Sequence, residues 1–132
     1  MKTSFLKFIF VPLCLLLFST QCEDDNPPLT QEDENQELIL LSTEIEDLAN
    51  TSVCNDTFQC KFIAFGSKPC GGPWRYLLYT TSIDFERLEL MVEGYNRKEA
   101  MYNTTWNIVS DCAVTNPPTG INCENNTCVA VF

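Results

Sequence analysis

The chain contains no histidine among its 132 residues. Histidine is the side chain that most often acts as a general base near neutral pH, and no serine or cysteine can be assigned a partner that would activate it as a nucleophile. Without histidine and without a Cys-x2-Cys pair, the sequence also lacks a zinc site of the usual spacing. We therefore expect a non-catalytic protein with no metal and no cofactor, while chemistry based on lysine or on paired carboxylates stays open.

The chain also lacks a basic patch. Residues 23–47 hold ten acidic side chains and no basic one, whereas residues 54–132 hold eight acidic and six basic side chains, so the net charge of -10 belongs mainly to the first segment. Arg97 and Lys98 are flanked by Glu93 and Glu99, which is typical of a solvent-exposed helix face with ion pairs between successive turns. Binding to nucleic acid needs concentrated positive charge, so no nucleic-acid partner is predicted.

No apolar run is long enough to cross a bilayer. The run from Phe8 to Phe18 follows Lys2 and Lys7 and is well short of the ~20 residues that a transmembrane helix needs. A short positive start followed by such a run is the pattern of a secretory signal peptide. We predict this signal peptide for residues 1–21.

The end of the apolar run contains a cysteine. Its sequence is Phe18-Ser19-Thr20-Gln21-Cys22, and Gln21 suits ordinary signal peptidase poorly because that enzyme prefers small side chains at the cut. This arrangement resembles the lipobox of bacterial lipoproteins, and Glu23-Asp24-Asp25 is similar to the export signal of surface lipoproteins in the Bacteroidota. The resemblance implies cleavage before Cys22, a lipid on its thiol, and an exported protein anchored to the outer membrane or cell surface of the cell envelope. The alternative is that Cys22 is one more cysteine of a soluble secreted protein.

The remaining chain divides into a tether and a domain. Residues 22–37 are acidic and contain two prolines, which is typical of an extended tether, and residues 38–132 are predicted to form one disulfide-rich domain. A helix over about 31–49 leads into the domain, because Thr30 can cap it and apolar residues recur at helical spacing. These residues are Leu38, Leu41, Ile45 and Leu48. Either the sheet of the same domain or a second copy of the helix covers this apolar stripe.

Patterns within the domain predict an α+β fold with a small antiparallel sheet packed with one or two helices. Aromatic and β-branched runs predict strands over 61–65, 74–80 and 106–114. Between them, Ser82 can cap a helix with an apolar face, and Glu86, Glu89 and Glu93 of that helix are expected to face solvent. The last segment, 120–132, predicts a hairpin with its turn at 124–127.

Six cysteines fall in the predicted domain: Cys54, Cys60, Cys70, Cys112, Cys123 and Cys128. Export would place them in an oxidising compartment, so three disulfides are expected. Cys123 and Cys128 flank the turn of the predicted hairpin, which favours a bond between them because facing strand positions are close enough for a disulfide. The pairing of the other four stays open.

The segment from Gly66 to Tyr76 concentrates turn formers, aromatic side chains and cations. It predicts a recognition loop that uses Lys68, Trp74, Arg75 and Tyr76, because aromatic residues and arginine dominate binding hot spots. The alternative is a tight turn in which glycines supply positive φ and the tryptophan packs on a helix.

Three short motifs lie in and after this loop: Cys70-Gly71-Gly72-Pro73, Tyr95-Asn96 and Ser110-Asp111-Cys112. With them, the chain from Cys60 onward resembles small Bacteroidota-type lipoproteins of uncharacterised function. The resemblance implies an architecture and a location but no activity.

Three classes of function follow from these patterns. The first is a membrane-anchored binding or interaction module for a protein or surface ligand; the second is a secreted disulfide-rich enzyme inhibitor with Ser67-Lys68-Pro69 as its exposed loop; the third is an unrecognised hydrolase. If the lipobox interpretation fails, the chain is a eukaryotic glycoprotein, since four Asn-x-Ser/Thr motifs begin at Asn50, Asn55, Asn103 and Asn125.

Overall fold

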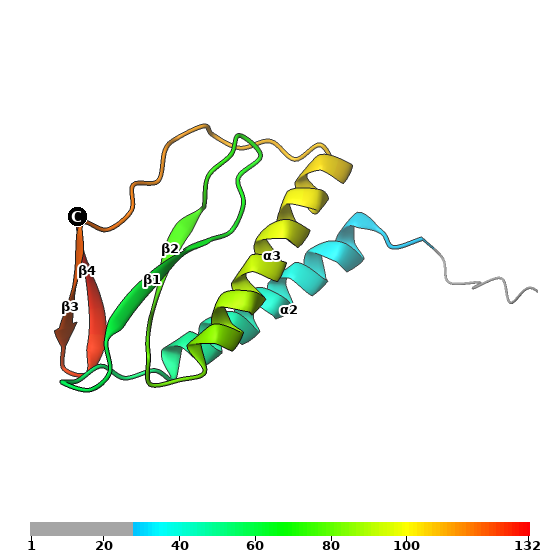
Figure 1. The fold of residues 1–132 in the computed structure, drawn as a ribbon. Helices are drawn as coiled ribbons and strands as arrows, with labels where there is room; N and C mark the ends of the chain where they lie inside the picture. The colour runs from blue at the N-terminus through cyan, green and yellow to red at the C-terminus, as the bar shows by residue number, and fades with distance from the viewer. Residues whose placement is uncertain (1–27) are drawn as a thin grey trace, which may run out of the picture.

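The computed structural model describes residues 28–132, so the predicted signal peptide and Cys22 lie outside the described residues. The chain forms α2 (Gln31–Asn50), β1 (Cys60–Phe65), β2 (Arg75–Thr80), α3 (Phe85–Thr105), β3 (Gly120–Glu124) and β4 (Thr127–Val131). Figure 1 shows three layers, with the two helices side by side, the β1–β2 pair in the middle and the β3–β4 hairpin on the far side. The predicted α+β class is confirmed. Neither described helix has the length and apolar character that crossing a membrane requires.

Helix α2 begins where the sequence predicts it. The Thr30 hydroxyl accepts a hydrogen bond from the Asp33 backbone N–H, and the Asp33 carboxylate accepts one from the backbone N–H of Thr30, so the two residues form a capping box. Hydrogen bonds to the Asp33 carboxylate from the Thr30 hydroxyl and from the Thr30 backbone N–H lower the pKa of Asp33 below its ordinary value. On the apolar stripe Leu38 and Ile45 are buried, and the stripe packs on α3 and β2 of the same domain.

Strands β1 and β2 pair antiparallel, with Ile63 opposite Leu77. One face of this pair supplies the core, because alternate side chains of a strand point to the same side. The core consists of residues from both helices and both strands: Ile45, Ala49, Phe65, Leu77, Tyr79, Leu88 and Val92. Phe65 also stacks on Tyr95 of α3, with ring centroids 4.8 Å apart. The sheet therefore joins the helices through one continuous apolar layer.

The start of α3 differs from the prediction. Asp84, not Ser82, caps the helix, since its carboxylate accepts a hydrogen bond from the Arg87 backbone N–H. The Ser82 hydroxyl instead accepts hydrogen bonds from the Val53 backbone N–H and the Thr80 hydroxyl. Ser82 thus connects the end of β2 to the chain that follows α2.

The strand predicted over 106–114 is wrong. Residue 106 follows α3 as its C-cap, and residues 108–118 form an extended connection that runs past the β1–β2 loop to the hairpin (Figure 1). This connection is held by side chains and not by hydrogen bonds to a neighbouring strand. Lys68 donates a hydrogen bond to the Ala113 carbonyl, and a disulfide joins Cys70 to Cys112. The β-type composition of this segment favours an extended backbone, but no neighbouring strand is placed to form backbone hydrogen bonds with it.

The predicted hairpin is confirmed, with Asn125 and Asn126 as its turn. Both asparagines have positive φ, 51° and 63°, as a two-residue type I′ turn requires. Cys123 and Cys128 face each other across the strands, yet the predicted bond between them is wrong. Cys123 bonds to Cys54 and Cys128 bonds to Cys60, because the side of the hairpin that carries both cysteines packs on the start of β1 and the chain before it.

Candidate functional site

Of the predicted recognition segment 66–76, residues 66–74 form the loop between β1 and β2, and the C-terminal half of α3 holds this loop in place. The Asn96 amide accepts a hydrogen bond from the Gly66 backbone N–H at 2.7 Å and donates one to the Ala64 carbonyl at 3.0 Å. One turn later the Glu99 carboxylate accepts the Ser67 backbone N–H, and one turn after that the Asn103 amide donates to the Ser67 carbonyl at 2.7 Å. Three polar side chains at helical spacing thus hold consecutive backbone groups of the loop.

Glycine is required where the loop begins. Gly66 has φ of 84°, and a Cβ built on it would lie 2.5 Å from Cδ1 of Trp74. Gly71 and Gly72 also have positive φ, and the Gly71 backbone N–H donates to the Lys68 carbonyl at 2.8 Å. The tight-turn interpretation of this segment therefore describes its backbone correctly.

Lys68 is not part of an exposed recognition surface. Its side chain is 8% exposed, its ammonium donates to the Ala113 carbonyl at 2.8 Å, and it lies 3.5 Å from the Asp111 carboxylate. The predicted role of Lys68 in recognition is wrong because the 108–118 connection covers it. The same burial removes Ser67-Lys68-Pro69 as an exposed inhibitory loop.

The other three predicted recognition residues do not gather on one surface. Trp74 is 40% exposed and contacts Gly66. Arg75 lies over the Phe65 ring and forms an ion pair with Glu46 of α2, while Tyr76 lies on the opposite face of the sheet against Phe62. Trp74 is the aromatic residue of the four that lines a described pocket, and the Lys68 ammonium lies over its ring, 5.2 Å from the centroid.

Two pockets adjoin the loop. The first, which we call the interhelix pocket, has a volume of about 320 Å³ between α2, α3 and Trp74. Its walls include Asn35, Leu38, Ile39, Ser42, Thr43, Trp74, Tyr95, Glu99, Tyr102, Asn103 and Ile108. The second, the loop pocket, has a volume of about 490 Å³ between the loop, the end of α3 and residues 107–109. Asn103 and Ile108 belong to both walls, so the two pockets are neighbours.

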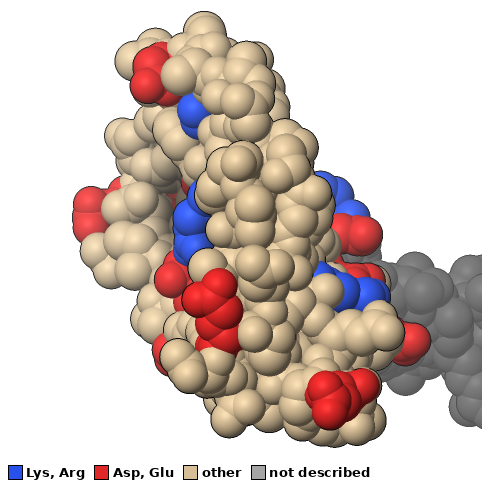
Figure 2. Space-filling view, turned by 90° about the vertical axis from the view of Figure 1, so that its left-hand side faces the viewer, with Lys and Arg blue, Asp and Glu red and all other residues tan. Residues whose placement is uncertain are grey.

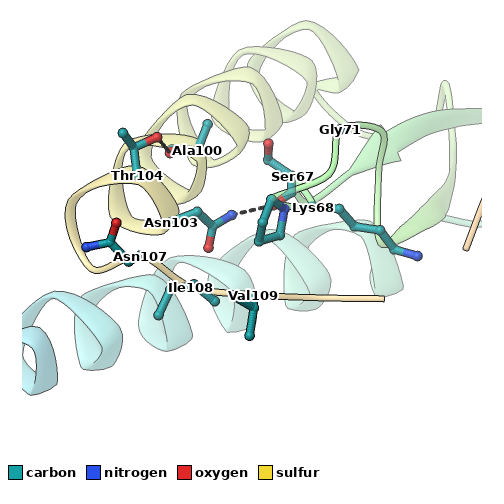
Figure 3. Close-up of a pocket in the computed structure, with 10 residues that line it drawn as sticks. Ser67, Lys68, Gly71, Ala100, Asn103, Thr104, Asn107, Ile108 and Val109 are labelled. Atoms are coloured by element: carbon teal, nitrogen blue, oxygen red, sulfur yellow. Dashed lines mark hydrogen bonds between the residues drawn. The ribbon is translucent and has the colours of Figure 1, made fainter. Parts of the chain in front are cut away.

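Figure 3 shows how side chains lie around the loop pocket. The Asn103 amide nitrogen points to the Ser67 carbonyl, and its oxygen points toward Ile108. The Lys68 side chain runs away from Asn103 and Asn107, in line with its bond to the Ala113 carbonyl. The lining of this pocket therefore mixes polar and apolar side chains and, among the described residues, carries no free cation.

Glu99 is the one carboxylate that lines either pocket. Burial raises the pKa of Glu99 above its ordinary value and outweighs the hydrogen bonds from the Ser67 N–H and the Tyr95 hydroxyl, which lower it. Burial and the neighbouring carboxylate raise the pKa of Tyr95 to about 12. The expectation that Glu99 belongs to an exposed ion-paired helix face is wrong, because it points inward to the loop.

A second polar cluster lies at the other end of the sheet. Glu89 was expected to face solvent, but it accepts a hydrogen bond from the Tyr79 hydroxyl and lies 3.5 Å from the Lys61 ammonium. The hydrogen bond from Tyr79 lowers the pKa of Glu89. Burial of Tyr79 and the neighbouring Glu89 carboxylate raise the pKa of Tyr79. The cluster joins β1 and β2 to α3, and it holds one carboxylate.

Charges of both signs are scattered over the hairpin side of the molecule, as Figure 2 shows. Among residues 28–132, the sulfurs of Cys54, Cys60 and Cys128 lie within 4.8 Å of one another, the spacing of a metal site. All three are in disulfides, and a metal binds the thiolate form. The cluster therefore offers no metal ligands in this state.

Sequence reasoning singled out the loop but not the helix face that holds it. Asn96, Glu99 and Asn103 recur at intervals of 3 and 4, a polar row beside the apolar face of α3. That spacing was the available signal, since polar residues in such a row meet the same partner. Asn103 was noted only as a glycosylation motif, and it is 7% exposed and hydrogen-bonded to the loop.

Comparison with known proteins adds no further assignment: no family model, no curated protein and no solved structure matches this chain.

Proposed function

We propose that the chain is an exported lipoprotein, held on a membrane by a lipid at Cys22, whose α+β domain is a non-catalytic binding module. The observation that carries this proposal is the cysteine pairing. All six cysteines of the described residues are joined in three disulfides, which suits an oxidising compartment. Cys22 is then left without a cysteine partner in the domain, and lipid attachment would use its thiol.

The distance from Cys22 to the domain supports a short tether. Helix α2 begins at Gln31, nine residues after Cys22. A fully extended chain spans at most about 3.6 Å per residue, so the domain would lie within ~30 Å of the anchor. Two acyl chains give stable membrane attachment, because each buried methylene contributes about 0.8 kcal/mol.

The adjoining pockets support the binding part of the proposal. Ligand sites are commonly concave and combine apolar walls with a few polar groups, and their volumes range from about 300 to 1,000 Å³. The interhelix and loop pockets fit this description. General acid-base chemistry commonly uses two groups with different pKa values, and Glu99 stands without a second carboxylate or a histidine.

Metabolic labelling with a palmitate analogue tests the anchor. We expect label on the wild type and on Cys14→Ala, the matched control within the predicted leader, and none on Cys22→Ala. The Cys22→Ala protein should also leave the membrane fraction. Equal labelling of wild type and Cys22→Ala, or no label on the wild type, would overturn the anchor.

A thiol count separates the anchored protein from a soluble secreted one. The mature lipidated chain, denatured without reductant, should react with no alkylating reagent. A secreted chain that keeps Cys22 free should take up one equivalent. A mass decrease on glycosidase treatment would instead favour the eukaryotic glycoprotein, with Asn50, Asn55 and Asn125 as its exposed acceptors.

A further inference from the structure

The interhelix pocket is rich in aromatic surface. Trp74, Tyr95 and Tyr102 line it, and Trp74 leaves 40% of its surface exposed. A large ring exposed beside a pocket is a common anchor for ligands, because it supplies contact area at a small cost in side-chain entropy. The Lys68 ammonium lies over the Trp74 ring, 5.2 Å from its centroid, so the other face of the ring is the flat apolar surface on which a ligand can stack.

Neutral hydrogen-bonding groups surround this wall. Among the described residues no partner engages the side-chain amide of Asn35 or the Oδ1 atom of Asn103, although Asn103 is only 7% exposed. The Tyr102 hydroxyl accepts a 3.4 Å hydrogen bond from the Gln31 amide, which leaves its own hydrogen available. Amides and hydroxyls both donate and accept, so the site can pair with groups that do the same.

Charged groups near the pocket are already engaged. Glu99 accepts hydrogen bonds from the Ser67 N–H and the Tyr95 hydroxyl, and Arg75 is paired with Glu46. Lys68 is turned to Ala113 and Asp111. A phosphate, sulfate or carboxylate ligand would find no free cation, and a buried charge without a partner is costly. The ligand that fits is therefore neutral.

The walls also argue against an extended peptide. Peptides are often bound by pairing their backbone with an exposed strand edge. Here the long walls are the helices α2 and α3, whose backbone groups are satisfied within each helix, so side chains alone face the ligand. Recognition in this pocket depends on amides, hydroxyls and rings.

A sugar combines these requirements, because its C–H face is apolar and its hydroxyls donate and accept hydrogen bonds. We propose that the interhelix pocket binds the neutral sugar units of a glycan, with the Trp74 ring as the stacking surface and Asn35, Tyr102 and Asn103 as hydrogen-bonding partners. The volume of about 320 Å³ suits one or two units. The loop pocket, which shares Asn103 and Ile108, continues the site with Ser67 and Asn107 for further units. This inference rests on the proposed binding function and names its ligand class.

The test uses the full mature chain, purified in a detergent without a sugar headgroup. The probes are immobilised neutral oligomers of glucose, mannose, galactose, xylose and N-acetylglucosamine, together with sulfated and uronic-acid glycans and a set of unstructured peptides. We expect binding to at least one neutral oligomer, with dissociation constants then measured by titration. Acidic glycans and peptides should bind at least tenfold more weakly.

Variants connect that binding to the pocket. Trp74→Ala and Asn35→Ala should each weaken binding of the selected oligomer tenfold or more, while Trp106→Phe, which changes the other tryptophan outside the pocket wall, should stay within twofold. Asn35 lies near the start of α2, and its side-chain amide has no hydrogen-bond partner among the described residues, so its replacement by alanine should leave the thermal midpoint unchanged.

The outcomes separate this inference from the proposal on which it rests. Absence of binding to every neutral oligomer at millimolar concentration, or binding unaffected by Trp74→Ala and Asn35→Ala, overturns the carbohydrate site. Preferential binding of a peptide or an acidic glycan also overturns it, yet leaves the binding module standing. Loss of palmitate labelling bears only on the anchor.

Discussion

Removing the disulfide between Cys54 and Cys123 should cost about 3 kcal/mol of unfolding free energy. The two cysteines are 69 residues apart, but the Cys60–Cys128 bridge stays closed, so the loop that opens runs only through residues 54–60 and 123–128. A crosslink over a loop of about 13 residues lowers the entropy of the unfolded chain by about 10 cal/mol/K in the chain-entropy model. The hairpin bond between Cys123 and Cys128 would enclose only a short loop and contribute about 2 kcal/mol. A loss of about 3 kcal/mol is a large part of the 5 to 15 kcal/mol typical of a small domain.

Urea unfolding of the double variant Cys54→Ala/Cys123→Ala measures this loss. The matched control is Cys70→Ala/Cys112→Ala, which opens a longer loop, with a sequence separation of 42, and should cost about 4 kcal/mol. Cys54 is 1% exposed, so its replacement also leaves a small cavity and brings the loss in the first variant closer to that of the control, in which Cys70 and Cys112 are exposed.

Peptide mapping of the unreduced wild type decides the pairing directly. Asp56 lies between Cys54 and Cys60, and Glu124 lies between Cys123 and Cys128, so cleavage at aspartate and glutamate separates all four cysteines. We expect linked fragments carrying Cys54 with Cys123 and Cys60 with Cys128. A fragment that links Cys123 to Cys128, or a loss below about 2 kcal/mol in the double variant, would refute the reasoning.

Four further substitutions have defined outcomes in thermal unfolding. Gly66→Ala should destabilise the fold by roughly 2 kcal/mol or more, because it places a Cβ at positive φ and against Trp74. Gly94→Ala, in the middle of α3, adds a Cβ that meets no atom within 4 Å and should stabilise the fold by about 0.5–1 kcal/mol. Equal effects of the two substitutions would contradict both assignments. Thr30→Ala should cost about 1 kcal/mol through loss of the cap on α2, and an unchanged midpoint would show that the cap contributes nothing. Burial raises the pKa of Glu99 above 4.5, so the ionised carboxylate destabilises the folded state increasingly as the pH rises through the folded pKa. The thermal midpoint of Glu99→Gln should therefore rise relative to that of the wild type between pH 4 and 7. A constant difference between the two midpoints would argue against the pKa shift.

The helices and the hairpin could be predicted because their signals are local. Thr30 with the stripe through Leu38 and Ile45 defines α2, and the Asn125-Asn126 pair defines a turn that few other residue pairs allow. Each signal lies within a few residues of the structure it specifies. Long-range contacts then add stability without altering these elements.

The cysteine pairing and the site could not be predicted, because both depend on how distant segments pack. The proximity of Cys123 to Cys128 is real, but the packing of the hairpin on β1 brings Cys60 and Cys54 to the same place. The burial of Lys68 likewise depends on residues 111–113, more than 40 positions later. The composition of the loop gives no information on which distant segment packs over it.

The connectivity of the three disulfides has a consequence for how the protein matures. Of the three bridges in the described residues only Cys70–Cys112 joins consecutive cysteines, and the other two join the last fourteen residues to Cys54 and Cys60. A chain that crosses a membrane from its N-terminus and is oxidised as it emerges would first join Cys54 to Cys60. If the chain is exported as proposed, Cys54 and Cys60 can reach their native partners only after Cys123 and Cys128 have crossed, so an early Cys54–Cys60 bond must be undone by thiol-disulfide exchange, a step of seconds to hours that an isomerase accelerates.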